Sequence, residues 1–270
     1  MAFEEKLQIA IERDYKVVKA NEIIQRAKFD LSLLEQKTFC FAVSKIKPTD
    51  EPNSWYKFTI NEYCGVCGIA KNNGKNIDDV KNALQQLRDK SFYLMNLDGD
   101  YETVGWLDKV IISPKSGTIR IRFDETMQKH LVGLIGNGNY TQYSLLCVLP
   151  MRSAYSLRLY ELLKSYIGLR HKEKEFDIDD LKIKLNAPYE RFPDFRRKAL
   201  EIATREINEF TDIEISWEPI KRGRKVIAVK FKMSERHAWG RYMNSKNAID
   251  QLDGQMHIRE YLEQNPKQNI

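Results

Sequence analysis

Eight cationic residues form two clusters in the second half of the chain. The first cluster is Arg191, Arg196, Arg197 and Lys198, and the second is Lys221, Arg222, Arg224 and Lys225. An arginine can donate two parallel hydrogen bonds to guanine O6 and N7, which discriminates between bases by about 1–3 kcal/mol per contact. Lysine and arginine also bind phosphates, which positions a protein on DNA without reading its sequence. The two clusters therefore suit binding to duplex DNA, although a solvated charged surface is the simpler alternative.

A helix is predicted from Pro193 to Phe210, and it would carry the first cluster near its N-terminus. Proline is tolerated in the first turn, and an early acid such as Asp194 complements the positive end of the helix dipole. Apolar residues three or four positions apart mark one buried face: Phe195, Ala199, Ile202, Ala203, Ile207 and Phe210. The opposite face carries Arg197, Glu201, Thr204, Arg205 and Asn208. We therefore predict DNA contacts from the first cluster and from Glu201, Thr204 and Arg205.

A β-hairpin is predicted directly after this helix. Ile213, Ile215 and Trp217 alternate with polar residues, as in a half-buried strand. The second cationic cluster surrounds Gly223 at the turn, and the chain returns through 226–231. A helix with a polar face beside a basic hairpin is the outline of a winged helix. Such a unit lays its helix in the major groove and presses its hairpin on the DNA backbone.

The first half of the chain repeats this order of elements. Residues 58–63 and 176–181 each read as a short strand, a polar cap and a helix start. The amphipathic helix predicted over 77–90 is followed by strands with turns at Asp98-Gly99 and at 114–117. We therefore predict an α+β fold with two tandem winged-helix domains related by a pseudo-repeat. The predicted boundaries are 1–132 for the first domain, 133–151 for a linker, 152–234 for the second domain and 235–270 for a polar tail.

The positive charge of the chain is concentrated in the predicted second domain. The whole chain of 270 residues has a net charge of +6. Residues 151–234 hold 19 Lys/Arg and 14 Asp/Glu, an excess of 5, whereas residues 1–130 hold 20 and 19. In the helix over 77–90, Lys81 and Arg88 face Asp78, Asp79 and Asp89. The charge distribution therefore favours the second domain as the main DNA-binding unit.

Motifs for other functions are missing from the sequence. It contains no G-x-x-x-x-G-K-[ST] phosphate loop, so ATP hydrolysis is not expected, and the four histidines are scattered. Cys64 and Cys67 form a lone C-x-x-C without the second ligand pair that a structural zinc site needs. Paired acids such as Asp179-Asp180 lie at predicted helix starts or turns, where aspartate caps. We therefore predict no catalytic residue, no metal site and no cofactor.

The N-terminal residues mix charges and lack the apolar block of a signal peptide, and no run of about 18 apolar residues appears. A cytoplasmic protein without a membrane partner is therefore expected.

Several motifs together resemble the plasmid replication initiators that bind iterons, the repeated sequences of an origin. One is VVKANEIIQRAKFDLSLLEQKTFCFAVSKIKP over residues 17–48. The others are SLRLYELL over 156–163, the segment 189–212, and Lys221-Arg222-Gly223-Arg224. The resemblance covers roughly residues 15–233. It implies two tandem winged-helix domains, of which the C-terminal one reads the repeats.

The resemblance also implies a mode of action and partners. Dimers of such initiators repress their own promoter, and monomers in equilibrium with them bind iterons and open the origin. The host replication initiator and helicase would be recruited, and the N-terminal domain would contribute backbone contacts and a dimer interface. By position, Arg158 becomes a further candidate for a phosphate contact.

Two alternatives remain beside a non-enzymatic initiator. One is a winged-helix transcriptional repressor without initiator activity. The other, from a different functional class, is a metal-dependent DNA nicking enzyme.

Overall fold

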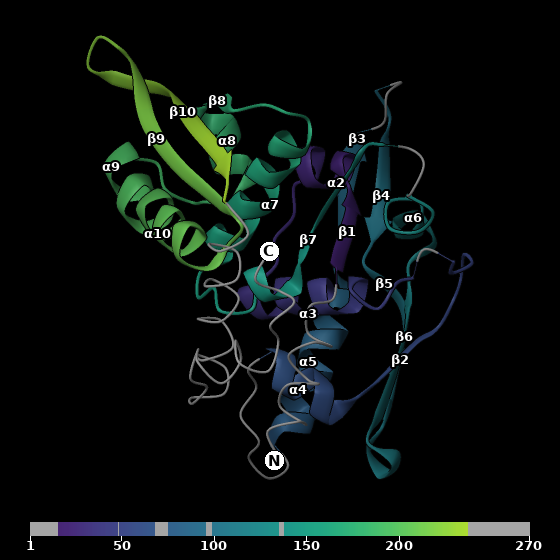
Figure 1. Cartoon of the computed structure of the whole chain (residues 1–270). Helices are drawn as coiled ribbons and strands as arrows, with labels where there is room; N and C mark the ends of the chain where they lie inside the picture. The colour runs from purple at the N-terminus through teal and green to yellow at the C-terminus, as the bar shows by residue number, and fades with distance from the viewer. Residues whose placement is uncertain (1–15, 48, 68–74, 96–98, 135–137, 237–270) are drawn as a thin grey trace, which may run out of the picture.

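The computed structural model describes residues 16–47, 49–67, 75–95, 99–134 and 138–236 (Figure 1). Its first half contains helices α2 (Asn21–Arg26), α3 (Leu33–Val43), α4 (Ile60–Cys67), α5 (Lys75–Asp89) and α6 (Glu125–Gln128). The strands of this half are β1 (Lys16–Ala20), β2 (Tyr56–Thr59), β3 (Ser91–Met95), β4 (Tyr101–Gly105), β5 (Leu107–Ser113), β6 (Thr118–Phe123) and β7 (Tyr140–Ser144). Short 3-10 turns lie at η1 (Pro114–Ser116) and η2 (Leu145–Cys147).

The second half begins with α7 (Ala154–Gly168). It continues with β8 (Glu173–Asp177), α8 (Ile178–Lys184), α9 (Phe192–Phe195), the π-helical segment η3 (Arg196–Leu200), α10 (Glu201–Phe210), β9 (Ile213–Arg222) and β10 (Lys225–Glu235). In both halves a helix, a strand and two helices precede a long hairpin. The antiparallel sheets have matching orders, β2-β6-β5 and β8-β10-β9. The structure therefore contains the two winged-helix units that the internal repeat predicts.

The first unit is built around an aromatic core. Trp106 is 1% exposed and meets the rings of Phe39 and Phe29 edge to face, at 4.7 and 4.8 Å between centroids. Ser32 caps α3 and Glu35 closes the capping box. The hairpin β3-β4 is inserted between α5 and the sheet β2-β6-β5.

The segment predicted as a linker, 133–151, is instead packed structure over most of its described residues. Strand β7 pairs antiparallel with β1, in register from Lys16↔Ser144 to Ala20↔Tyr140. The apolar side chains of 145–149 that follow it are all buried. The glycines and the missing charge suggested a linker, but apolar residues without charges also suit a buried strand. Strand β1 is followed directly by α2, without a connecting loop.

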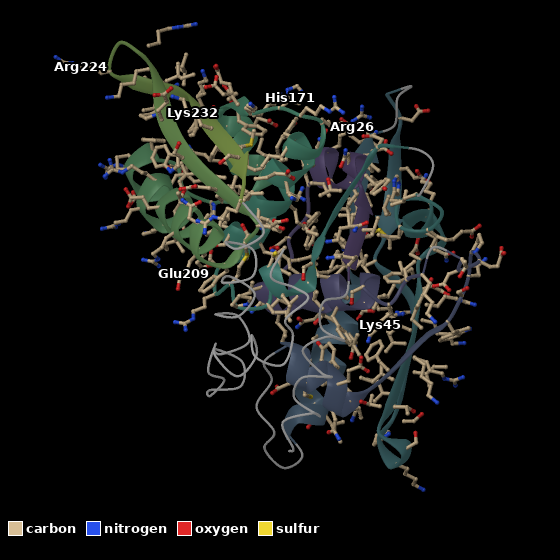
Figure 2. All side chains as sticks on the ribbon, in the orientation of Figure 1. Arg26, Lys45, His171, Glu209, Arg224 and Lys232 are labelled. Carbon is tan, nitrogen blue, oxygen red and sulfur yellow. The ribbon has the colours of Figure 1, made fainter. Side chains whose placement is uncertain are left out.

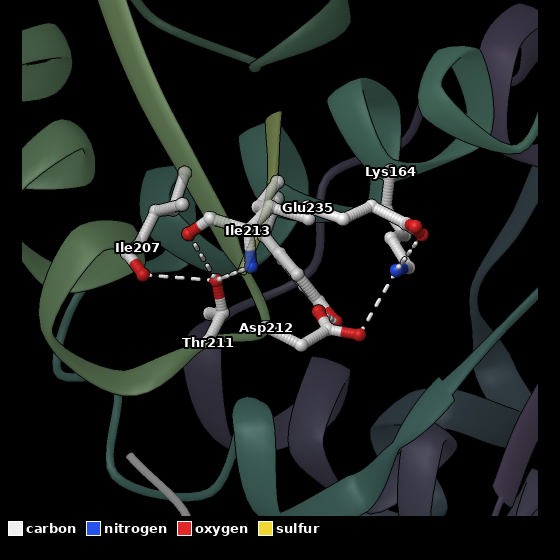
Figure 3. Close-up of polar contacts among 7 residues, drawn as sticks. Lys164, Ile207, Thr211, Asp212, Ile213 and Glu235 are labelled. Atoms are coloured by element: carbon white, nitrogen blue, oxygen red, sulfur yellow. Dashed lines mark hydrogen bonds and ion pairs between the residues drawn. The ribbon is translucent and has the colours of Figure 1, made fainter. Parts of the chain in front are cut away.

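Helix α7 joins the two halves of the molecule. Its Lys164 binds Asp212 at 2.9 Å and Glu235 at 3.4 Å, at the junction of α10, β9 and β10 (Figure 3). On the other side, Glu161 accepts a hydrogen bond from Lys19 of β1 at 2.6 Å, and both side chains are at most 5% exposed. Buried side chains of both halves form one continuous core.

The predicted tail lies outside the described residues except for Glu235 and Arg236. Glu235 ends β10, and the backbone N–H of Arg236 donates to the carbonyl of Asp212 at 3.0 Å.

Candidate nucleic-acid interface

The predicted DNA-reading helix spans Phe192 to Phe210 without a break, but it is not a regular α-helix. Its second turn, Arg196–Leu200, is π-helical, and the flanking residues Phe195 and Glu201 keep right-handed helical backbone angles. A π-turn contains one residue more than an α-turn, and such turns are frequent at functional sites. Three consecutive residues of this turn, Arg196, Arg197 and Lys198, are exposed between the buried Phe195 and Ala199.

The buried face of the helix differs from the predicted stripe at two positions. Leu200, absent from the predicted apolar stripe, is fully buried, whereas Ile202 in that stripe is only partly buried. The other five predicted positions, Phe195, Ala199, Ala203, Ile207 and Phe210, are buried as expected. Leu200 lies three residues before Ala203 and seven before Ile207, so it belongs to the same helical face, and the predicted stripe was wrong at these two positions.

The cations of the helix make only exposed ion pairs and ring contacts with neighbouring side chains. Arg197 is 70% exposed in its side chain and lies 3.6 Å from Asp194. Arg196 lies 3.2 Å from Glu201, with both side chains about half exposed. Lys198 lies over the ring of Tyr189, 5.3 Å from its centroid. Surface ion pairs of this kind contribute about 0–1 kcal/mol, so a phosphate or a base can replace them.

The remaining residues predicted to contact DNA from the helix differ in their exposure and in their free hydrogen-bonding groups. Glu201 and Arg205 are exposed, and Arg205 makes no ion pair with any described residue. Thr204 is half-buried and donates its hydroxyl hydrogen to the Leu200 carbonyl at 2.8 Å, so only its oxygen lone pairs are available. Arg191 is the exposed N-cap residue of α9 and has no capping bond from its side chain.

The hairpin β9-β10 carries the second cationic cluster at its tip. Arg222 pairs with Lys225, which leaves Gly223 and Arg224 as the two turn residues. Gly223 has φ +62°, a conformation that glycine adopts without strain. Figure 2 shows Arg224 at the far end of this hairpin, away from the body of the protein. Within the described part of the chain, none of the four cations makes an ion pair, and all are exposed.

Side-chain hydrogen bonds fix the hairpin relative to the helix. The Asn208 amide donates to the Ile215 carbonyl at 2.8 Å and accepts from the Ile215 N–H, also at 2.8 Å. Phe192 at the helix start meets Trp217 of β9 edge to face, with 6.5 Å between ring centroids. Sequence reasoning placed Asn208 on the polar face and missed this role. The sequence signal for this role is an asparagine in the interior of a predicted helix, where the helix propensity of asparagine is low.

Glu206 is another residue that sequence reasoning missed. It is 5% exposed, and its Oε2 accepts from the backbone N–H groups of Arg152 and Ser153, at 3.2 and 3.3 Å. These bonds connect α10 to the N-terminus of α7, where an acid also complements the helix dipole.

The structure contradicts the expectation that Arg158 contacts a phosphate. Arg158 is 3% exposed and donates to the carbonyls of Ala27 and Lys184, at 2.7 and 3.1 Å. Its guanidinium also lies 4.4 Å from the centroid of the Phe29 ring. Burial lowers the pKa of Arg158 to about 10. This arginine therefore connects the two halves of the molecule and is buried away from the surface that DNA could reach.

The first unit has a basic surface in the position that corresponds to the reading helix and hairpin of the second unit, but its cations are partly neutralised. A groove of ≈ 600 Å³ between α5 and β5 is lined by Lys81, Arg88, Lys109 and Arg122, among others. Lys81 pairs with Asp78 at 3.5 Å and Arg88 with Asp89 at 3.0 Å. These pairs agree with the predicted difference in charge between the two units.

The cysteines of the described residues have no feature of a reactive or metal-binding site. Cys40, Cys64 and Cys147 are buried, while the side chain of Cys67 lies outside the description. Burial raises the pKa of Cys40 to about 11 and that of Cys147 to about 12, so both are protonated thiols at neutral pH. Over the described residues, no three His, Cys, Asp or Glu side chains converge as metal ligands would. In the same part of the chain, no helix combines the length and apolarity needed to cross a membrane.

Two family models match the chain. The model described as "Initiator Replication protein, WH1" matches residues 16–164, and that described as "Initiator Rep protein, WH2" matches residues 177–233. Among curated proteins, the PI protein of Escherichia coli is 30% identical over 149 residues, which are 49% of this chain and 48% of that protein. The match thus spans about half the length of that relative.

One solved structure shares the overall fold. It is described as the Pi initiator protein in complex with iteron DNA, and it matches with a TM-score of 0.67 and 22% sequence identity. The match covers 83% of this chain and 99% of that one.

Proposed function

Because the chain belongs to the initiator replication protein family, with both its WH1 and its WH2 modules, we propose that it initiates plasmid replication by binding iterons at the origin. The second unit is the main reader in this proposal. The observation that carries it is the helix 192–210 beside the hairpin β9-β10, which together present eight cations on exposed surface: Arg191, Arg196, Arg197, Lys198, Lys221, Arg222, Arg224 and Lys225.

The two parts of this surface have different roles. The helix enters the major groove, where Arg196, Arg197 and Lys198 reach base edges together with Glu201, Thr204 and Arg205. The hairpin cations bind phosphates and hold the helix in register. The fold shared with a Pi initiator protein solved on iteron DNA supports this arrangement.

The later steps of initiation follow from binding. Occupied repeats bend the DNA and destabilise an adjacent AT-rich segment, and the bound protein recruits the host replication initiator and helicase. Binding and assembly supply the free energy. A homodimer in equilibrium with the monomer represses the protein's own promoter and limits copy number.

Footprinting of the full chain on DNA flanking its own gene tests the proposal. We expect protection of several repeats, and a plasmid carrying those repeats should replicate in cells only when the gene is present. Protection of a single operator without replication would instead identify a repressor. Cleavage of supercoiled origin DNA in magnesium would identify a nicking enzyme.

A further inference from the structure

The outer face of the sheet β2-β6-β5 carries a group of basic and aromatic residues to which the proposed function gives no role, although two of them, Lys109 and Arg122, also line the groove beside α5. Lys57 of β2 is directly opposite Arg120 of β6, and Arg122 is opposite Lys109 of β5. Side chains alternate between the two faces of a strand, so Trp55 lies on the same face as Lys57. We call Trp55, Lys57, Lys109, Arg120 and Arg122 the β6 platform.

The opposite face of this sheet is the core of the first unit. Tyr56, Phe58, Ile119 and Ile121 are at most 7% exposed, whereas Lys57, Lys109 and Arg120 between them are exposed. The core therefore fixes the backbone beneath the platform, and the platform residues themselves contribute little to burial.

Trp55 is the centre of the platform. Its side chain is 40% exposed, although a tryptophan buries more apolar surface than any other residue. The guanidinium carbons of Arg120 and Arg122 lie 5.7 and 5.3 Å from its ring centroid, which orients the ring by cation–π contacts. The ring is thus held in place and still open to solvent.

The charge of the platform is poorly neutralised. Arg122 donates to Asp108 at 2.7 Å, but among the described residues Lys57, Lys109 and Arg120 make no ion pair. Beside Trp55 and Lys57 a cleft of ≈ 750 Å³ continues past the exposed Lys47. Several neighbouring cations suit a polyanion, which carries one charge after another, better than they suit a single acidic side chain.

We propose that the β6 platform binds single-stranded DNA. A flat sheet with an exposed aromatic ring and surrounding cations stacks an unpaired base and holds the adjacent phosphates. A duplex offers no free base face, and reading its major groove requires a protruding helix or ribbon. The inference rests on the proposed function, since origin opening supplies the unpaired strand.

The position of the platform fits this role. In Figure 1 the sheet β2-β6-β5 lies on the right of the molecule, and α10 with the hairpin β9-β10 lies on the left. One chain can therefore hold duplex repeats with its second unit while its first unit holds an unpaired strand.

Fluorescence anisotropy with a labelled oligothymidylate of about 15 nucleotides tests the inference, because sites of this kind cover about 4–16 nucleotides. The full-length Trp55→Ala variant should bind it about 5- to 150-fold more weakly, the equivalent of the 1–3 kcal/mol that one base–aromatic stack contributes. Arg120→Ala should lower the slope of log affinity against log salt by about 0.7. Trp55→Phe should keep most of the affinity because its ring still stacks.

Two matched variants serve as controls. Tyr101→Ala removes another exposed aromatic of the first unit and should leave oligothymidylate binding unchanged. Arg224→Ala should weaken binding to duplex repeats and leave the oligothymidylate affinity as it is. Thermal unfolding of every variant checks that the fold is kept.

The outcomes separate the inference from the proposed function. Unchanged oligothymidylate binding by Trp55→Ala and Arg120→Ala would overturn the platform, as would equal weakening on single strands and duplex repeats. A wild-type chain that binds duplex repeats but no single strand would also overturn it and leave the proposed function standing. A wild-type chain that binds the single strand but no duplex repeat would contradict the proposed function instead.

Discussion

At the scale of single residues, exposure decides which arginines are available to DNA. Arg197 is 70% exposed and Arg158 is 3% exposed, although both lie in segments that the family resemblance singles out. To bind DNA, a guanidinium must give up water or a weakly bound partner for a base or a phosphate. The guanidinium of Arg158 instead donates its hydrogen bonds to buried backbone carbonyls. The two residues therefore lead to opposite predictions for binding.

Arg197→Ala should weaken origin binding by about 1–3 kcal/mol and relax the base preference at one position of the repeat, because a bidentate contact to guanine would be lost. Gel shifts on the native repeat and on single-base variants measure both effects. Arg26→Ala, an exposed arginine of α2 that pairs with Glu22, is the matched control and should bind normally. Wild-type affinity and preference in Arg197→Ala would remove this residue from the reading face.

Arg224→Ala should weaken binding to all sequences alike, because a hairpin cation at a phosphate carries no sequence information. The slope of log affinity against log salt should fall by about one unit. A salt titration with specific and unrelated duplexes gives this slope directly. A loss confined to the specific duplex would mean that Arg224 reads a base.

At the scale of elements, Asn208 is the side chain that hydrogen-bonds the reading helix to the hairpin. Asn208 bonds both the N–H and the carbonyl of Ile215, in the manner of a backbone pair. These two bonds connect the helix to β9, and the exposed cations Arg196, Arg197 and Lys198 lie on the same helix.

Asn208→Ala should lower the free energy of unfolding by about 1–3 kcal/mol, because two backbone groups of Ile215 lose their partner. Affinity for duplex repeats should fall as well, although no DNA contact is removed. Urea unfolding and gel shifts measure the two effects. Asn208→Asp keeps the acceptor for the Ile215 N–H and should be intermediate, and equal stability of all three proteins would contradict this account.

At the scale of the whole molecule, buried polar residues connect the two units. Burial alone would lower the pKa of Lys19, but its electrostatic interactions and hydrogen bonds with Cys40 and Glu161 outweigh that effect and raise the pKa. Burial alone would raise the pKa of Glu161, but the charge and hydrogen bond of Lys19 outweigh it and lower that pKa. Arg158 and the pair Lys19–Glu161 thus fix how the second unit sits on the first.

Arg158→Ala should lower the free energy of unfolding by about 2–4 kcal/mol, because the carbonyls of Ala27 and Lys184 lose a charged donor and Phe29 loses a packing partner. Urea unfolding measures this loss. The salt slope of DNA binding should stay at the wild-type value. A slope reduced by one unit would restore Arg158 as a phosphate contact.

Glu161→Gln should lower the free energy of unfolding by about 3–5 kcal/mol near neutral pH, because Lys19 stays buried without its counter-charge. The lowered pKa of Glu161 gives stability that is present above its ordinary value of 4.5 and is lost as pH falls through the folded pKa. The raised pKa of Lys19 gives stability that is present below 10.5 and is lost as pH rises through the folded pKa.

Urea unfolding across this pH range should therefore show two sloping limbs in the wild type and weaker ones in Glu161→Gln. Glu209→Gln, an exposed acid on α10, is the control and should keep the wild-type profile. Parallel profiles for wild type and Glu161→Gln would show that the pair contributes nothing to pH-dependent stability.

The sequence by itself determined the family, the α+β class and the two winged-helix units. The apolar stripe of the reading helix and the glycine of the hairpin turn depend on neighbours within a few residues, and the structure confirms the glycine and five of the six stripe positions. Both family models match, so the resemblance is confirmed as well. The DNA contacts predicted for the exposed cations stay predictions.

Only the tertiary structure decided which polar residues are buried and what they bind. Arg158, Asn208 and Glu206 meet partners that lie between 7 and 131 positions away in the chain. The pairing of β7 with β1 made the predicted linker part of the core. The sheet β2-β6-β5 likewise brought Trp55 next to Arg120 and Arg122. Local patterns set the elements, but contacts between distant residues exist only once the chain has folded.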